Sequence, residues 1–274
     1  TVSVDISSGA ERIMETLEEL SRIDHVTGQA GTNVGGMLEK VRITMANLTN
    51  KNPSEVFIQD LLAVDTSVPI NVKGGLAGEF SLEQAVGIAS MVKSDHLQME
   101  IIAKEVEQNL GIPVEIGGQE AESAILGALT TPGTTKPMAI LDLGAGSTDA
   151  SIINASDQIH AIHLAGAGNM VTMLINSELG LEDIHLAEDI KKYPLAQVLS
   201  VYHIRHEDGS VQFFKEPLPA TLYARVVIVK PAGLVPIEKD VSLERIKMVR
   251  QTAKQRVFVT NSIRALQVVS PTHN

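Results

Sequence analysis

Apolar residues near the start of the chain recur every three or four positions, which is the spacing of one helix face. This pattern predicts an amphipathic helix over residues 10–20 and a second helix over 37–48, after a glycine-dense stretch at 28–36. The second helix should end at Asn50, because the sequence continues as the turn-forming Asn-Lys-Asn-Pro.

A strand and a further helical region are predicted next. Apolar residues at 56–64 indicate the strand. Ser81, followed three positions later by Gln84, has the form of a capping box and predicts a helix start. Ser94 can cap the continuation of this helix, which should end at Gly111. Residues 112–116 then predict a strand, and 120–129 a helix rich in small residues.

Three apolar runs in the middle of the chain predict an antiparallel meander. They cover 138–143, 150–153 and 159–164, and turns separate them at Gly144-Ala-Gly146 and at 154–158. Continuous apolar runs of this length are typical of buried strands.

The last third of the chain predicts helices at 169–179 and 181–192. A hairpin should follow, with 198–206 and 211–214 joined at Asp208-Gly209, then a strand at 222–229 and a final helix capped by Ser242. Because helices and strands are interspersed throughout, the fold class is α/β. The segment 132–136 is the best internal domain boundary.

Composition narrows the classes of function. The 274 residues include 33 acidic and 22 basic side chains, and the net charge of −11 argues against a nucleic-acid partner. No apolar run approaches the ~20 residues of a membrane helix, so no membrane partner is expected. The absence of cysteine excludes disulfides and thiolate metal sites, and it agrees with a cytoplasmic location.

The turn from Asp142 to Asp149, with the sequence DLGAGSTD, is the strongest candidate for chemistry. Its glycines allow a tight bend in which successive N–H groups can point at one phosphate. Asp142 could hold Mg²⁺ through water, and Ser147 and Thr148 add hydroxyl donors. An ordinary glycine hairpin remains the alternative. The P-loop and the dinucleotide fingerprint do not match, because the motif continues into a strand.

Other candidates are weaker. His160 with His163, and His203 with His206, lie three positions apart on predicted strands, so each pair should face opposite sides and not share a metal ion. The glycine-rich stretch 74–78 is interpreted as a connection and not as a phosphate loop.

Four segments in one order resemble the actin and heat-shock-chaperone ATPase superfamily. Residues 142–149 resemble its second phosphate motif, 117–129 its connecting helix, 163–169 its glycine turn, and 188–191 its adenosine-side helix. Within that superfamily, FIQDLLAVDTS (57–67), GALTTPGTT (127–135), LDLGAGSTDASIIN (141–154) and RHEDGSVQFF (205–214) are similar to the large subunit of the diol and glycerol dehydratase-reactivating factors.

The resemblance implies an actin-like, ribonuclease H-like ATPase fold. Residues 1–132 would form the remainder of one lobe with its connecting helix, and 133–274 a second lobe. The family is a chaperone-like ATPase that lets damaged cobalamin leave an inactivated adenosylcobalamin-dependent dehydratase. It works with a small subunit in a heterotetramer, and its ligands are ATP or ADP with Mg²⁺.

Carried over by resemblance, the site residues have distinct roles. Asp142 would hold Mg²⁺ and Glu120 would orient the attacking water. The phosphates would meet Gly144, Ala145, Gly146, Ser147 and Thr148, and the adenosine would meet Glu188 and Lys191. Each role has a structural alternative: Glu120 can cap its helix, Asp149 can brace the hairpin, and Glu188 with Lys191 can form a solvated i,i+3 pair.

The sequence also departs from the family pattern. The family is about twice as long, the N-terminal Asp-x-Gly hairpin is missing, and the middle glycine of the turn is Ala145. We therefore expect this chain alone to bind nucleotide weakly and to hydrolyse little. A non-catalytic interaction module and a small-molecule kinase of the same superfamily are the alternative functions.

Overall fold

The chain divides into two compact units. The computed structural model describes residues 2–20, 26–66, 80–83, 86–92, 96–118 and 120–270. The first unit comprises Thr1–Met170 and Val257–Asn274, and the second comprises Val171–Arg256. This division into compact units does not test the boundary between two ATPase lobes that the sequence places after residue 132, so that boundary stays a prediction. Among the described residues, no helix has the length and apolar character that crossing a membrane requires.

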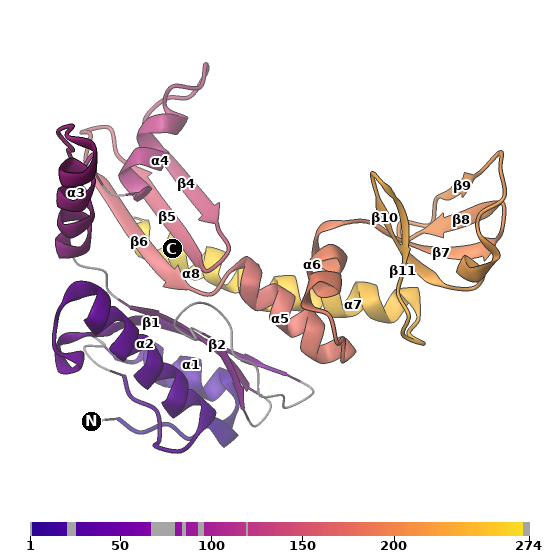
Figure 1. Ribbon diagram of the computed structural model, residues 1–274, viewed down its shortest axis with the longest axis horizontal. Helices are drawn as coiled ribbons and strands as arrows, with labels where there is room; N and C mark the ends of the chain where they lie inside the picture. The colour runs from indigo at the N-terminus through magenta and orange to yellow at the C-terminus, as the bar shows by residue number, and fades with distance from the viewer. Residues whose placement is uncertain are drawn as a thin grey trace. The chain divides into compact units, whose positions relative to one another are not determined.

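The first unit contains two separate antiparallel sheets and their covering helices (Figure 1). Its elements are α1 (Ala10–Glu18), α2 (Asn33–Thr49), β1 (Ile58–Asp65), β2 (Phe80–Glu83), β3 (Val86–Val92), α3 (His96–Leu110), α4 (Glu120–Ala128), β4 (Met138–Leu143), β5 (Ser147–Ile153), β6 (Ile159–Ala165), the start of α5 (Gly168–Leu179) and α8 (Thr260–Val269), with 3-10 turns at Ile6–Ser8 and Pro53–Glu55.

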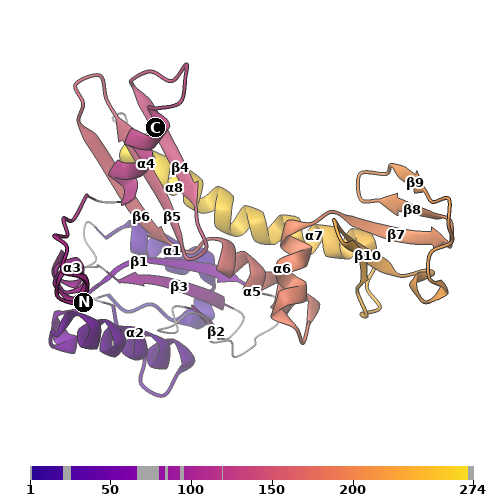
Figure 2. The same ribbon diagram turned by 45° about the horizontal axis from the view of Figure 1, so that its top comes forward.

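The first sheet has the strand order β1-β3-β2 and packs helices α1 and α2 on one face (Figure 2). Thr32 caps α2 by accepting a hydrogen bond from the Gly35 amide, and Asn50 ends it in the left-handed conformation, as the turn sequence predicts. On the outer edge of β1, the Ala63 amide contacts the Met14 Sδ of α1 at 3.4 Å. The predicted first two helices and the first strand are therefore confirmed.

Two predictions in this region are wrong. Ser81 does not open a helix but lies in β2, where it pairs with Ile88 of β3. The pairing of buried β3 with two strands overrides the local capping signal, which is weak without a packed helix face. Residues 112–116 form no strand, since Ile112 and Ile116 are exposed and unpaired among the described residues. Gln84, Ser94 and the stretch 74–78 lie outside the described residues.

The second sheet of this unit is the predicted meander, with strand order β4-β5-β6. Its register places Asp142 opposite Asp149, and Asp149 opposite His163, so these three side chains share one face. The other face carries Ala150 and Leu164, which pack against α8. β4 is only partly covered, although its sequence is typical of a buried strand.

The second unit is built on a five-stranded antiparallel sheet with the order β11-β10-β7-β8-β9. Its elements are the rest of α5, α6 (Ile184–Lys192), β7 (Leu195–Ser200), β8 (His203–His206), β9 (Val211–Phe213), β10 (Val226–Lys230), β11 (Gly233–Pro236) and α7 (Leu243–Lys254), with a 3-10 turn at Ala220–Leu222. A π-helical segment, Gln255–Val259, follows α7.

The predicted hairpin and the Ser242 cap of the second unit are confirmed. β8 and β9 are joined through Asp208 and Gly209, and Gly209 has a φ of 90°. The single strand predicted over 198–206 is wrong, because the chain turns back after Ser200 and the two halves pair as β7 and β8.

Candidate functional site: a glycine turn with open amides

The turn at residues 144–146 joins β4 to β5 and is closed by its own backbone. The Gly144 amide donates to the Ser147 carbonyl oxygen at 3.0 Å. Ala145 and Gly146 are exposed at the tip, where a side chain on Gly146 would meet nothing. The bend predicted from the glycines is therefore confirmed.

A second turn, at residues 166–169, uses all three carbonyl groups of the first. The amides of Gly166, Gly168 and Asn169 donate to the oxygens of Gly146, Gly144 and Ala145, at 3.0, 3.0 and 2.7 Å respectively. Within the described ranges, the amides of Ala145 and Gly146 donate to no protein acceptor. The turn thus presents donors to solvent while its acceptors are occupied, and this is the arrangement that an anion requires.

Asp142 is the penultimate residue of β4, and Leu143 connects it to the turn. Its side chain is exposed, and no described residue forms a hydrogen bond or ion pair with it. A free carboxylate beside open amides can reach a cation that is itself bound to an anion, as the sequence suggested.

Asp149 braces the hairpin, which was the structural alternative foreseen for it. Its carboxylate accepts a hydrogen bond from the Ser147 hydroxyl at 2.8 Å and from His163 Nδ1 at 2.6 Å. The hydrogen bond to Asp149 raises the pKa of His163, burial opposes the shift, and the charges of Asp149 and Glu120 add to it. Asp149 thus ties the turn to β6.

The two hydroxyl groups of the motif are both engaged inside the protein. A serine has a single O–H, and that of Ser147 is directed to Asp149. Thr148 is fully buried and donates to the Gly166 carbonyl oxygen at 3.0 Å. In this structure neither hydroxyl proton faces outward, so the open amides are the donors that remain for a ligand.

Glu120 is the first residue of α4 and is exposed. Helix α4 packs against β4, β5 and β6 on the face opposite α8, which is the face that carries Asp149 and His163. The charge of Glu120 makes a small contribution to the raised pKa of His163. The structure therefore brings Glu120 to the same face as Asp142, while its proposed action on water remains a prediction.

Glu188 and Lys191 lie in the second unit and pair with each other on α6. Lys191 Nζ is 2.6 Å from Glu188 Oε2, Lys192 Nζ is 2.8 Å from Oε1, and Thr172 donates to the same carboxylate. Desolvation opposes ionisation of Glu188, but hydrogen bonds from Lys191, Lys192 and Thr172 lower its pKa to about 2. Contact of either side chain with adenosine stays a prediction.

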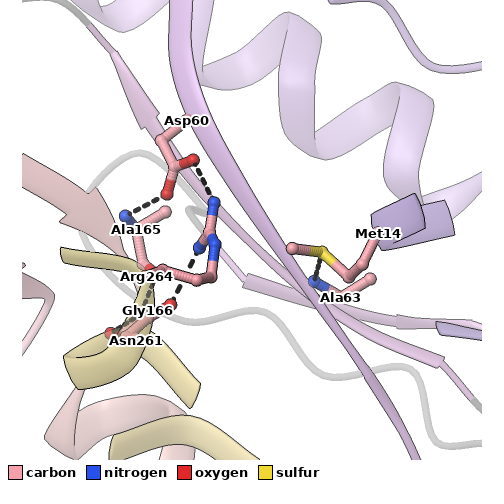
Figure 3. A network of polar contacts seen from close by, with 7 residues as sticks. All are labelled: Met14, Asp60, Ala63, Ala165, Gly166, Asn261 and Arg264. Atoms are coloured by element: carbon pink, nitrogen blue, oxygen red, sulfur yellow. Dashed lines mark hydrogen bonds and ion pairs between the residues drawn. The ribbon is translucent and has the colours of Figure 1, made fainter. Parts of the chain in front are cut away.

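A buried polar network in the first unit was missed by the sequence analysis. Asp60, Asn261 and Arg264 bond to one another or to the backbone at Ala165 and Gly166 (Figure 3). Two sequence signals could have found it. Asp60 is a charge within an apolar strand run, and Asn261 falls on a stripe of buried residues spaced by four: Val257, Ala265 and Val269.

The chain falls in the class of ATPase-like domains, because the family model that it matches describes such a domain. A family model described as "Diol dehydratase reactivase ATPase-like domain" matches residues 4–274, and the chain belongs to this family. The resemblance found in the sequence motifs is thus confirmed at the level of the family.

Curated relatives and solved structures agree with this assignment. The chain is 69% identical to the propanediol dehydratase-reactivating factor large subunit of Salmonella typhimurium and 68% identical to the diol dehydratase-reactivating factor large subunit of Klebsiella michiganensis, each over 100% of the chain and 45% of the relative. It matches a structure of diol dehydratase-reactivating factor in nucleotide free form with a TM-score of 0.83 at 69% identity, over 99% of this chain and 45% of that one. A glycerol dehydratase reactivase structure matches with a TM-score of 0.84 at 56% identity, over 98% and 45% of the two chains. The chain therefore spans just under half the length of these relatives.

Proposed function

We propose that this chain is the phosphate-binding part of a dehydratase-reactivating factor that binds and hydrolyses ATP. The observation that carries the proposal is the turn at 144–146, whose Ala145 and Gly146 amides are open while its carbonyl groups are held by residues 166–169. The names of the relatives add the client, an inactivated diol, propanediol or glycerol dehydratase.

In this proposal ATP binding and hydrolysis allow damaged cobalamin to leave the adenosylcobalamin-dependent dehydratase, so that intact coenzyme can enter. The open amides of Ala145 and Gly146 receive the phosphates, while Gly144, Ser147 and Thr148, whose donors are used inside the protein, fix the shape of the bend. Glu120 orients the attacking water. Glu188 and Lys191 contact the adenosine. The words "large subunit" in the names of the relatives support a small-subunit partner, which we propose forms a heterotetramer with the large one.

The donor set near the turn fits a magnesium ion that arrives with the nucleotide. Among the described residues, no three acidic or histidine side chains gather to hold a metal on their own. Asp142 is a single free carboxylate, and Mg²⁺ is commonly held by one or two carboxylates together with phosphate oxygens and water. When bound, the ion would neutralise phosphate charge beside Asp142.

The test is a calorimetric titration of the full-length protein and of this chain with ADP and Mg²⁺. Asp142→Ala should weaken binding clearly, whereas Asp240→Ala, which removes an exposed carboxylate of the second unit, should leave it unchanged. If Asp142→Ala binds as tightly as wild type, the assignment of this turn is wrong.

A second assay separates the remodelling factor from the alternative functions. Inactivated dehydratase is incubated with the factor, ATP and fresh coenzyme, and the recovery of dehydratase activity is measured. Recovery that requires ATP hydrolysis supports the proposal. Recovery without hydrolysis indicates a non-catalytic interaction module, and ATP consumption that rises with a sugar instead of the dehydratase indicates a kinase.

A further inference from the structure

The strongest unassigned feature is the buried network of Asp60, Asn261 and Arg264 in the first unit. Arg264 donates to Asp60 Oδ1 through Nη2 and to Asn261 Oδ1 through Nη1, both at 2.8 Å. Asn261 is fully buried and Asp60 is 8% exposed. Charged groups at such depth are costly unless they are paired and hydrogen-bonded, so the pairing itself needs an explanation.

The network's other bonds all go to the backbone of two consecutive residues. Asp60 Oδ2 accepts from the Ala165 amide at 2.8 Å, and Asn261 Nδ2 donates to the carbonyl oxygens of Ala165 and Gly166, both at 2.7 Å (Figure 3). Every polar atom of the Asp60 carboxylate and of the Asn261 amide is therefore used. A fully satisfied network of this kind fixes geometry more than it adds stability.

The two fixed residues lead directly into the second turn, at 166–169, which holds the turn at 144–146 (the phosphate turn). The Gly166 amide donates to Gly146, and the following amides of Gly168 and Asn169 donate to Gly144 and Ala145. Gly166 itself has a φ of 89°, and a Cβ there would lie 2.7 Å from Leu62 Cδ2 of β1. The backbone at 166 is thus pressed against β1 on one side and bonded to the turn on the other.

We infer that Asp60, Asn261 and Arg264 are positioning residues for the phosphate turn. They hold residues 165–166 in place at the start of the second turn, and the amides of that turn at Gly166, Gly168 and Asn169 hold the carbonyl groups of 144–146, so that the open amides keep their direction. The role in ligand affinity rests on the proposed function, whereas the role in fixing the turn does not.

The test uses the full-length protein and two variants of the network, Asn261→Ala and Arg264→Gln. Hydrogen–deuterium exchange of peptides covering 165–169 reports whether the amides that hold the turn have been released, and calorimetry with ADP and Mg²⁺ reports affinity. Val41→Ala serves as the matched control, because it truncates a buried side chain of the same unit that takes no part in the network's bonds.

The inference predicts faster hydrogen exchange at 165–169 in both network variants than in Val41→Ala. The variants are compared under conditions in which their free energies of unfolding are equal. ADP affinity should fall about tenfold, the order expected when a hydrogen bond to a charged phosphate oxygen is lost. If exchange at 165–169 is the same in the network variants as in the control, the inference is overturned. If wild type binds no ADP, the proposed function fails, while the exchange measurement still decides the positioning role.

Discussion

Replacing Gly166 by alanine tests the close approach between the second glycine turn and β1. An L-residue at a φ of 89° costs about 1–2 kcal/mol. The added Cβ would lie 2.7 Å from Leu62 Cδ2, and Leu62 is fully buried, so overpacking adds about 1–3 kcal/mol. We expect Gly166→Ala to destabilise the first unit by about 2–5 kcal/mol.

The contribution of the contact can be separated from that of the backbone. Gly133 has a φ of 90°, and a Cβ added there would meet nothing within 4 Å, so Gly133→Ala should show the backbone cost alone, about 1–2 kcal/mol. Leu62→Ala removes the atom that clashes with the new methyl group, although it leaves a cavity. The double variant Gly166→Ala with Leu62→Ala should therefore be less destabilised than the sum of the singles by about 1–3 kcal/mol.

Urea unfolding of these variants is followed by hydrogen exchange of peptides from residues 138–169, so that the first unit alone is observed. Strictly additive free energies in the double variant, or equal losses for Gly166→Ala and Gly133→Ala, would refute the contact with Leu62 as the cause.

Three further outcomes are expected. Asp149→Asn should lower the pKa of His163 measured by NMR; the stability from this pair is present below pH 6.5 and is lost as pH rises through the raised folded pKa. Thr148→Val should cost about 1 kcal/mol in urea unfolding, because the Gly166 carbonyl group keeps its bond from Asn261. The second unit should lose stability in circular dichroism as pH falls from 4.5 to about 2, and Glu188→Gln should flatten that part of the profile.

Each of these outcomes has its own contradiction. An unchanged His163 titration in Asp149→Asn would show that another group sets the His163 pKa. A loss above about 3 kcal/mol in Thr148→Val would indicate that the valine itself does not fit. Glu182→Gln, at an exposed position of the second unit, is the control for Glu188→Gln. If stability falls equally with pH in the two variants, Glu188 is not the cause of the loss of stability in acid.

Elements with local signals were predictable from the sequence. The meander and the Asp208-Gly209 hairpin follow from apolar runs separated by turn residues, and these runs are close enough in the chain to pair with each other. The helix predicted from Ser81 failed because its signal was equally local, whereas the observed state depends on how β2 and β3 pair and pack. A capping pattern cannot report that competition.

The candidate site shows the same division. The turn at 144–146 and its aspartate are contiguous, so the sequence identified them. The bonds that Asp60 accepts from the Ala165 amide and from Arg264 join residues 105 and 204 positions apart. No pattern in one sequence encodes such a pairing, although a lone charge within an apolar strand marks one of its ends.

The turn at 144–146 has a consequence for the kind of molecule it can select. With its oxygen atoms turned inward to residues 166–169, the bend offers outward only N–H hydrogens, so its polarity has one sign. An uncharged sugar or a bare nucleoside can accept only neutral hydrogen bonds from these amides, which are weaker than bonds to a charged oxygen, and the amides themselves repel a lone cation. The turn therefore selects ligands by the number of negatively charged oxygen atoms that they carry, and not by their sugar or base.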